Sequence, residues 1–280
     1  MIEQQSVVVV TDSTSDIPKA LAEELGIVVV PLLVSFGTES FRDGIDLTPD
    51  EFIDRLVASE KLPTTSQPPS AAFEEVFREA IERGQDVVCV TISSALSGTF
   101  NAARLAAESV DPGRIRVVDS QSATMQLGLV VVATARVARQ GAPLEEVEAA
   151  TRSAMGRVQL VAVLQTLDYV HKGGRIGKAQ QLVGTALGIK PILSVVDGVL
   201  VPVERVRTWK KAVARLTEMI RPTPSDIFVL HTRNMEDARA LAETLQHTFP
   251  DTPIQIDSAG ATITTYAGPG AVGIAVLYPD

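Results

Sequence analysis

Short runs of aliphatic and β-branched residues alternate with longer segments of helical spacing in the first half of the chain. The runs predict buried strands at residues 6–10, 86–91 and 114–118, and a longer extended segment at 27–35. Thr48 or Asp50 is available to cap one of the helices. Hydrophobic residues recur at helical intervals at 17–25, 51–59, 70–83, 99–109, 123–139 and 144–155. This alternation predicts a parallel sheet covered by helices on both faces.

The second half of the chain has a different pattern. An apolar run at residues 160–164 precedes a glycine-rich stretch at 171–177, and we expect a helix from there to about residue 187. Asp197-Gly198 separates two apolar segments, 192–196 and 199–205, and is a strong signal for a β-hairpin turn. The remaining pattern predicts helices at 209–220 and 236–247 and strands at 226–230, 253–256 and 272–277. A hairpin combined with helices indicates a mixed sheet.

We therefore expect an α/β protein of two domains. Residues 1–157 should form a three-layer α/β/α domain around a parallel sheet, and residues 158–280 a smaller α/β domain with a mixed sheet. A chain of 280 residues is long enough for both. Hydrophobic residues make up 45% of the chain and aromatic residues only 4%, so the core should consist of Val, Leu, Ile and Ala.

Charge and hydropathy narrow the class of protein. The net charge of −9 argues against nucleic-acid binding, which usually needs a basic surface. The N-terminus lacks the features of a secretory signal, and no uninterrupted apolar run approaches the roughly 20 residues of a membrane span. We expect a cytoplasmic protein without stable membrane insertion. The single cysteine, Cys89, lies in an apolar run and is expected to be a buried strand residue.

Four loops rich in hydroxyl side chains are candidates for a ligand-binding site. They lie at residues 11–16, 64–70, 93–99 and 119–122. Each loop precedes a helix, and Ser, Thr and Asp are preferred helix caps, so capping alone could explain any one of them. Gathered at the carboxyl edge of one parallel sheet, however, they would offer neutral donors and helix N-termini to an anion. Basic residues are scarce in these loops, which favours a single carboxylate over a phosphate.

Common enzyme and cofactor motifs do not fit. The first loop offers Asp12 but lacks the second carboxylate that an aspartyl-phosphatase needs, and Ser97 lacks the flanking glycines of a nucleophile elbow. Ala179 stands where a P-loop needs Ser or Thr, and the glycine pattern at 268–273 precedes a strand instead of joining a strand to a helix. The three histidines show no metal-ligand spacing: His171, His231 and His247. We expect no catalytic residue, no metal and no cofactor.

These loops, in this order, resemble the DegV family, which includes fatty-acid-binding proteins of the FakB type. Seven segments carry the resemblance and span nearly the whole chain. They are TDSTSD at 11–16, PTTSQP at 63–68, SSALSGTFNAA at 93–103, VDSQSATMQLG at 118–128, LDYVHKGGRIGKA at 167–179, LGIKPIL at 187–193 and AGPGAVG at 267–273. The combination of TSQP with SSxLSGT is highly specific, whereas either alone would not be.

The resemblance implies a lipid tunnel in which a long-chain fatty acid is bound as ligand. It implies that the carboxylate is held by Thr65 of TSQP and Ser97 of LSGT, with Ser94 in the same loop as a further candidate. The family pattern commonly has a His before G-P-G-A, and Tyr266 stands there in this chain. A Tyr hydroxyl donates one hydrogen bond but stays neutral near pH 7. Arg175 is the candidate basic residue near the entrance, and a contact with a partner protein is equally open for it.

Proteins of the FakB kind hand their fatty acid to a partner kinase, so the resemblance implies a carrier subunit and not an enzyme. Two other classes of function stay open. One is a hydrolase or other enzyme acting on a small anionic substrate in the same cleft, for example with Ser97 and His231. The other is a regulatory module whose bound lipid controls a partner protein.

Overall fold

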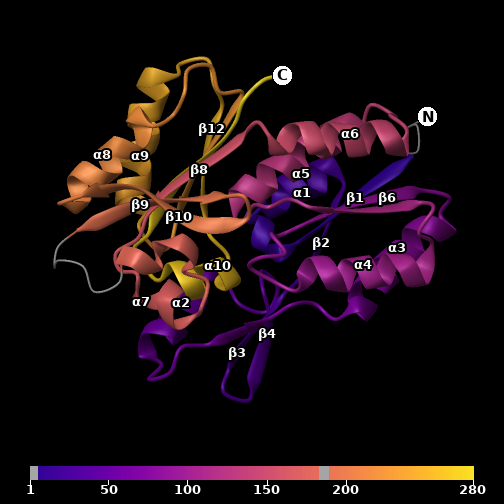
Figure 1. Ribbon diagram of the computed structural model, residues 1–280, viewed down its shortest axis with the longest axis horizontal. Helices are drawn as coiled ribbons and strands as arrows, with labels where there is room; N and C mark the ends of the chain where they lie inside the picture. Colours follow the sequence, from indigo (N-terminus) through magenta and orange to yellow (C-terminus); the bar gives the residue numbers. More distant parts are fainter. Residues whose placement is uncertain (1–5, 183–188) are drawn as a thin grey trace.

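A four-stranded parallel sheet organises the N-terminal part of the computed structural model, which describes residues 6–182 and 189–280 (Figure 1). Across this sheet the strands are β2 (Ile27–Val30), β1 (Val7–Asp12), β6 (Asp86–Thr91) and β7 (Ile115–Asp119). One face is covered by α1 (Lys19–Leu25), α5 (Met125–Ala138) and α6 (Leu144–Met155), and the other by α3 (Ser70–Glu82) and α4 (Thr99–Val110). The predicted three-layer α/β/α arrangement is confirmed.

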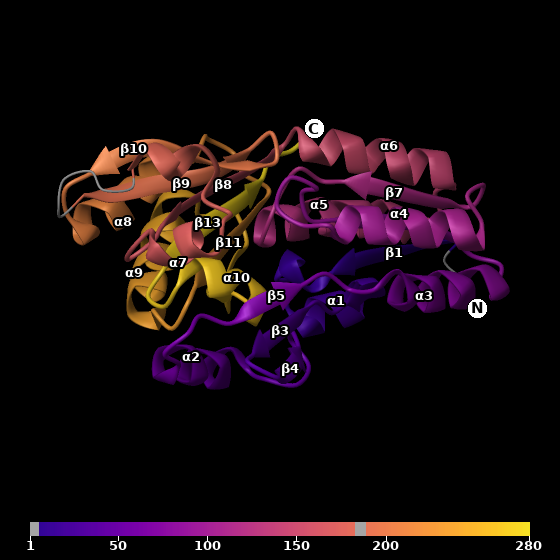
Figure 2. The same cartoon turned by 60° about the horizontal axis from the view of Figure 1, so that its bottom comes forward.

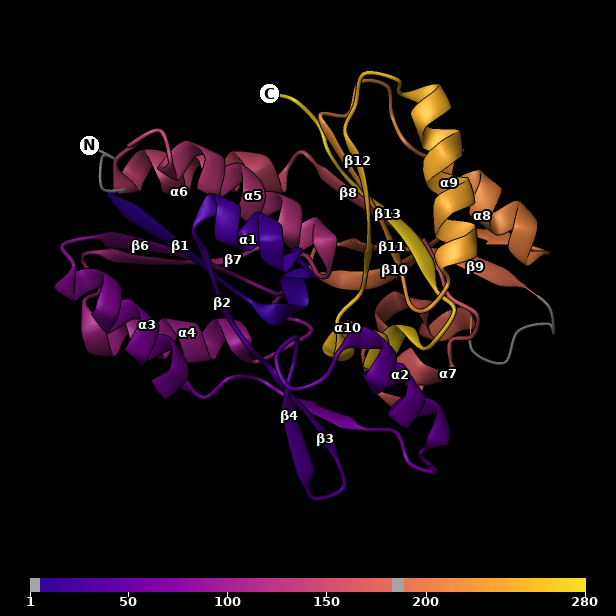
Figure 3. The same ribbon diagram turned by 180° about the vertical axis from the view of Figure 1, so that it is seen from behind.

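A separate six-stranded mixed sheet organises the C-terminal part, as predicted. Its strands, in order, are β10 (Val199–Val206), β9 (Lys190–Val196), β8 (Val158–Val163), β13 (Val272–Leu277), β11 (Asp226–His231) and β12 (Ile254–Ser258). Only β11 and β12 run parallel, and β9 and β10 form the hairpin predicted from Asp197-Gly198. The helices α8 (Trp209–Glu218) and α9 (Met235–Thr248) pack together on the outer face (Figure 3).

Helix α5 is shared by both large sheets. Nearly every residue of α5 is buried, as expected for a helix that is apolar all round. The cluster around α5 includes Val9 and Val88 of the parallel sheet as well as Leu160 and Ala275 of the mixed sheet. The two sheets are therefore joined by a continuous core, and Figure 2 shows them on either side of the inner end of α5.

A small antiparallel sheet connects the two parts on the opposite side of the molecule. It consists of β4 (Glu39–Arg42), β3 (Leu33–Phe36) and β5 (Thr64–Ser66), and it leads into α2 (Pro49–Ala58), which lies beside α10 (Ala261–Ala267) (Figures 1 and 2). The prediction of one extended segment at 27–35 was wrong, because Pro31 interrupts it and the two halves join different sheets. Thr48, one of the two predicted caps, accepts a hydrogen bond from Glu51 N.

Short helices near the mixed sheet differ most from the sequence prediction. The glycine-rich stretch at 171–177 begins within α7 (Asp168–Lys172), a helix that the sequence analysis did not predict, and α10 was missed altogether. The helix expected from residue 177 to about 187 is a 3-10 helix, η2 (Gly177–Leu182), as far as residue 182, and the rest of that prediction lies outside the described residues. A second 3-10 helix, η1 (Ser13–Ser15), follows β1. None of the described helices is long and apolar enough to cross a membrane.

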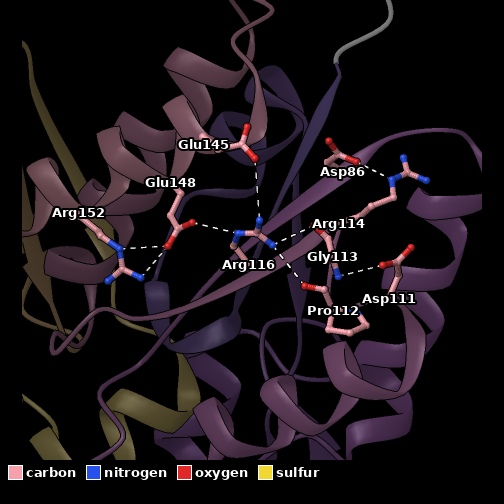
Figure 4. A network of polar contacts seen from close by, with 9 residues as sticks. All are labelled: Asp86, Asp111, Pro112, Gly113, Arg114, Arg116, Glu145, Glu148 and Arg152. Atoms are coloured by element: carbon pink, nitrogen blue, oxygen red, sulfur yellow. Dashed lines mark hydrogen bonds and ion pairs between the residues drawn. The ribbon is translucent and has the colours of Figure 1, made fainter.

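A network of charged residues flanks β7, the edge strand of the parallel sheet (Figure 4). Arg116 Nε lies 3.2 Å from Glu148 Oε2 on α6, and its Nη1 donates to the carbonyl oxygens of Pro112 and Gly113. Arg114 Nε lies 2.7 Å from Asp86 Oδ1. Such partly exposed ion pairs contribute only about 0–1 kcal/mol each, but charges at an edge strand disfavour pairing with another chain.

Candidate functional site

A cavity of about 380 Å³ lies where the two large sheets and α10 meet, within the range of about 300–1,000 Å³ that is typical of small-molecule pockets. Side chains from both halves of the chain line it. The wall is mainly aliphatic, including Leu96, Ala123, Leu160, Ala162, Leu193 and Ile263. An interior of this kind suits an aliphatic ligand.

Thr65, Ser97, Arg175 and Tyr266 all line this cavity. Thr65 Oγ1 and the Tyr266 hydroxyl share a hydrogen bond of 2.6 Å, which joins β5 to α10 across 201 residues of sequence. The Arg175 guanidinium lies over the Tyr266 ring, with Cζ 5.2 Å from the ring centroid, and Arg175 Nε donates to Leu96 O. Hydroxyl groups and a cation therefore lie together on one part of a mainly apolar wall.

Gly98 leaves room for the Gln67 side chain where the TSQP and LSGT segments meet. A Cβ on Gly98 would lie 2.1 Å from Gln67 Oε1, so only a residue without a side chain lets Gln67 come so close to the start of α4. Ser97 Oγ accepts a hydrogen bond from Thr99 N and shares another with Thr99 Oγ1, at 3.3 and 2.9 Å. Ser97 is thus held at the helix start and also faces the cavity.

Ser94 lies elsewhere. It is exposed, its backbone N–H donates to Asp119 Oδ1 at 3.1 Å, and it does not belong to the cavity lining. The structure therefore brings four of the five residues expected to contact ligand to one cavity and leaves Ser94 outside it.

Two further glycines allow close packing of the Tyr266 and Tyr169 rings. A Cβ on Gly173, after α7, would lie 2.5 Å from the Tyr266 ring, and a Cβ on Gly268, after α10, would lie 2.4 Å from the Tyr169 ring. Gly268 also has φ +70°, which favours glycine. The ends of α7 and α10 therefore pack together through two aromatic rings, each of which lies against the backbone of a glycine. This packing gives a structural reason for Gly173 in the KGGR segment and for Gly268 in the AGPG segment.

The TDSTSD loop has a second role besides lining the cavity with Thr14. Asp16 accepts hydrogen bonds from Thr124 Oγ1 at 2.6 Å and from the backbone N–H of Gly260 at 2.9 Å. Asp43, which the sequence analysis did not single out, accepts from the backbone N–H of Ala261 at 2.8 Å. Both carboxylates therefore satisfy donors at the start of α10, the helix that carries Tyr266.

Burial makes these acids unusually weak. Desolvation raises the pKa of Asp12 to about 6 and that of Asp16 to about 8, and it also raises the pKa of Asp43. The wall beside them is formed by Thr14, from the loop at 11–16 that the sequence analysis named, and by Thr124 and Thr262, which it missed. A ligand carboxylate placed there would meet acids whose hydrogen-bond donors are already in use, whereas one placed at Tyr266 would meet Arg175.

The pairing of Ser97 with His231 that a hydrolase would use is not formed. Ser97 bonds with Thr99, while His231 Nδ1 accepts a hydrogen bond from Asn234 N at 3.3 Å. His231 lines a smaller adjoining cavity of about 70 Å³, to which Ser97 does not belong. Cys89 is buried as expected, and burial raises its pKa well above the ordinary value. Within residues 6–182 and 189–280, no group of three or more His, Cys, Asp or Glu could hold a metal ion.

Fold and site together define a mixed α/β protein with an apolar cavity between two sheets and a cluster of hydrogen-bond donors on the cavity wall. The chain belongs to the DegV family: the model of the uncharacterised proteins of this family matches residues 6–279. A DegV domain-containing protein of Caldanaerobacter subterraneus is 34% identical, with 96% of this chain and 98% of the relative aligned.

Solved structures with the same fold include relatives described by their ligands. A DegV family protein from Thermus thermophilus, described as fatty-acid-binding, matches with a TM-score of 0.90 and 33% identity over 98% of this chain and 100% of the other. DegV from Bacillus subtilis, also described as a fatty-acid-binding protein, matches with 0.90 and 32% over 99% and 100%. A stearic-acid-binding protein from Eubacterium ventriosum matches with 0.84 and 28% over 96% and 97%.

Proposed function

We propose that this protein binds one long-chain fatty acid in the 380 Å³ cavity and carries it to a partner kinase that phosphorylates the carboxyl group. The observation that carries the proposal is a mainly aliphatic cavity whose wall carries hydroxyls and a guanidinium from Thr65, Ser97, Tyr266 and Arg175. The fatty-acid-binding relatives from Thermus, Bacillus and Eubacterium support it.

Burial of the acyl chain supplies the affinity in this proposal. A sixteen-carbon acid has about fourteen methylenes, and at about 0.8 kcal/mol each their burial is worth about 11 kcal/mol. Immobilising the ligand offsets a large part of that gain. The remainder is enough for tight binding without a strong ion pair at the carboxylate.

The carboxylate needs partners, because an unpaired buried charge is strongly disfavoured. The Thr65–Tyr266 pair and Ser97 provide hydroxyl donors, and Arg175 adds a positive charge beside them. The wall near Asp16 and Asp43 is the less favourable alternative, because the Thr124 hydroxyl and the backbone N–H groups of Gly260 and Ala261 already donate to these two acids. We therefore orient the ligand with its carboxylate at Tyr266.

The cluster contains no candidate nucleophile paired with a base, so we place the catalysis in the partner kinase. We also place the protein in the cytoplasm, as the sequence analysis expected. Tyr266 takes the place of the His that the family pattern commonly carries. It keeps a hydrogen-bond donor but adds no charge, which leaves Arg175 as the cation of the site. We retain the two-domain division at residues 157 and 158, with the ligand between the two domains.

Mass spectrometry of the purified protein tests the proposal. Protein produced in bacteria and purified without detergent should show a native mass higher by one fatty acid, and the excess should disappear on denaturation. Protein that is empty and also fails to take up added fatty acids would rule out the carrier function. Turnover of a generic ester, lost in Ser97→Ala, would instead favour a hydrolase.

A further inference from the structure

The hairpin of β9 and β10 forms one aliphatic wall of the ligand cavity. Leu193 and Val195 of β9 and Leu200 of β10 belong to the lining. Only 2% of Leu193 and 5% of Val195 is exposed, so the cavity is closed to solvent on this side. Val196, at the tip of the hairpin, is 46% exposed, so solvent lies directly behind this wall.

The exposed part of the lining lies at the opposite, polar end of the cavity. The exposed lining residues are Ser66, Gln67, Gly98 and Arg175, which belong to the head-group cluster or stand next to it in the chain. An acyl chain that entered there would pass a guanidinium and several hydroxyls before it reached the aliphatic wall. Removing water from such groups is costly. A path through the aliphatic wall avoids this cost.

The outer part of the hairpin is not paired with the rest of the mixed sheet. Among the described residues, β9 forms only two residue pairs with β8, and the last of them joins Leu193 to Ala162. Residues 194–201, which we call the flap, pair only with one another. If the β8–β9 ladder continued, Val195 would lie opposite Leu160. Instead, both residues line the cavity.

A bulge in β10 lies where the hairpin leaves β8. The register between β9 and β10 shifts between Pro202 and Glu204, which lie opposite Leu193 and Ile192. A β-bulge bends a strand and locally disrupts its ladder. The base of the flap is therefore the point at which the hairpin can bend.

Two side chains of other elements donate hydrogen bonds to the flap, among the residues that the structure describes. Buried Ser93 donates from Oγ to Gly198 O at 2.8 Å. Gln126 Nε2 lies 3.4 Å from Val195 O, which is longer than the usual range of about 2.7–3.2 Å. Ser93 follows β6, so its bond joins the tip of the flap to the half of the molecule that contains the parallel sheet, towards which the hairpin extends in Figure 2.

We infer that the flap opens about its base to let the acyl chain enter and leave through the aliphatic wall, and that the Ser93–Gly198 hydrogen bond holds it closed. This inference rests on the proposed fatty-acid function and specifies the path of the ligand. Opening separates Leu200 from Gly177 of η2, against which its backbone packs. The residues of the head-group cluster lie on other elements, so the carboxylate keeps its partners while the flap is open.

A disulfide between positions 93 and 198 tests the inference. In the double variant Ser93→Cys/Gly198→Cys the two Cβ atoms would lie 3.5 Å apart, within the range of about 3.5–4.5 Å that is usual for a disulfide. Thiol titration of the oxidised form should find one free cysteine, Cys89. Gly198 has φ +79°, so the reduced form of the same variant, which carries the same backbone strain, is the control.

Stopped-flow mixing of delipidated protein with parinaric acid, a fluorescent fatty acid, measures both rate constants. In the oxidised variant the association and dissociation rate constants should fall together by about 30-fold or more, with Kd unchanged, because the closed flap blocks both directions equally. Reduction should restore them. If the oxidised form exchanges ligand as fast as the reduced form, the chain enters at the polar end and the inference is wrong.

Ser93→Ala provides the second arm. Loss of the bond to Gly198 should raise both rate constants by the same factor, about 2- to 10-fold, and leave Kd unchanged. Ser93 Oγ also accepts from Ala95 N at 3.2 Å, in the loop that carries Ser97. A purely structural role in that loop would therefore change Kd and leave the association rate unaltered, which would contradict the inference.

Thr151→Val is the matched control for Ser93→Ala. It also removes a buried hydroxyl that donates to a backbone carbonyl at 2.8 Å, that of Val147, but Thr151 does not line the cavity. Both rate constants should stay at the wild-type values. The two proposals fail differently: wild-type protein that binds no fatty acid refutes the carrier function and this inference together. Normal Kd values with equal rates in the oxidised and reduced variant refute only the inference.

Discussion

Replacing Tyr266 with Phe removes one hydroxyl and leaves a ring of nearly the same size. In the structure this hydroxyl lies 2.6 Å from Thr65 Oγ1, so one of the two hydroxyl hydrogens is used within the pair. One hydrogen remains to be donated to a ligand carboxylate. Thr65 and Tyr266 should therefore act as one donor unit, and breaking either half should break the unit.

The size of the effect follows from this arrangement. We expect Tyr266→Phe and Thr65→Val each to weaken fatty-acid binding by about 1–3 kcal/mol, the range for leaving a buried polar group without its partner. That corresponds to about 5- to 150-fold in Kd. Because both changes remove the same unit, the double variant should lose clearly less than the sum, with a coupling energy of about 0.5–3 kcal/mol.

Displacement of a fluorescent fatty acid from delipidated protein measures all four Kd values of this cycle. Tyr278→Phe is the matched control. The Tyr278 hydroxyl also makes hydrogen bonds: it donates to Gln159 Oε1 at 2.6 Å and accepts from Arg221 N at 3.0 Å. Tyr278 does not line the cavity. It should lower the melting temperature and leave the Kd unchanged. Strictly additive losses, or single variants that bind normally, would refute the reasoning.

Four more changes probe the head group, the tunnel, the packing of Tyr266 and the buried acids. Ser97→Ala should weaken binding by about 1–3 kcal/mol, measured by calorimetric titration. Ala162→Phe should block acyl binding by filling the cavity, at a cost in folding stability of about 1–3 kcal/mol. Gly173→Ala places a Cβ 2.5 Å from the Tyr266 ring and should weaken binding by displacing that ring. Burial raises the pKa of Asp16 from 3.8 to about 8, so between these pH values the folded protein binds a proton that the unfolded chain lacks. The free energy of unfolding should therefore fall by up to about 1.4 kcal/mol per pH unit as pH rises from about 4 to 8. In urea unfolding, Asp16→Asn should flatten that slope.

Each of these changes has an outcome that contradicts it. Normal binding by folded Ala162→Phe protein would place the acyl chain elsewhere. Gly173→Ala protein with unchanged Kd would mean that α7 and α10 shift together without moving the Tyr266 hydroxyl. A pH slope of the Asp16→Asn variant equal to that of the wild type would show that Asp16 is ionised throughout the range. Ser94→Ala, outside the cavity, is the control for Ser97→Ala and should bind normally.

The hydroxyl-rich loops illustrate how far local sequence reasoning reaches. It correctly marked them as special, and the segments of Thr65 and Ser97 do meet at one cavity. It treated the loop at Thr11–Asp16 only as a ligand contact. Thr14 of that loop does line the cavity, but Asp16 accepts a hydrogen bond from Gly260, 244 residues away. A carboxylate that binds a ligand and one that caps a distant helix look alike in a sequence, because both need donors supplied from elsewhere.

The spacing of apolar residues determined the two large sheets and most of the helices. Each strand buries one face and each helix buries one stripe, so the positions of apolar residues within a segment indicate which element it forms. Only the tertiary structure decided α10. Its sequence, ATITTYA, is rich in β-branched residues that favour strands, and it forms a helix where Asp16 and Asp43 satisfy the donors at its start. The same long-range contacts place Tyr266 beside Thr65 and close the cavity. Their energy comes from residues more than two hundred positions apart, which no local pattern contains.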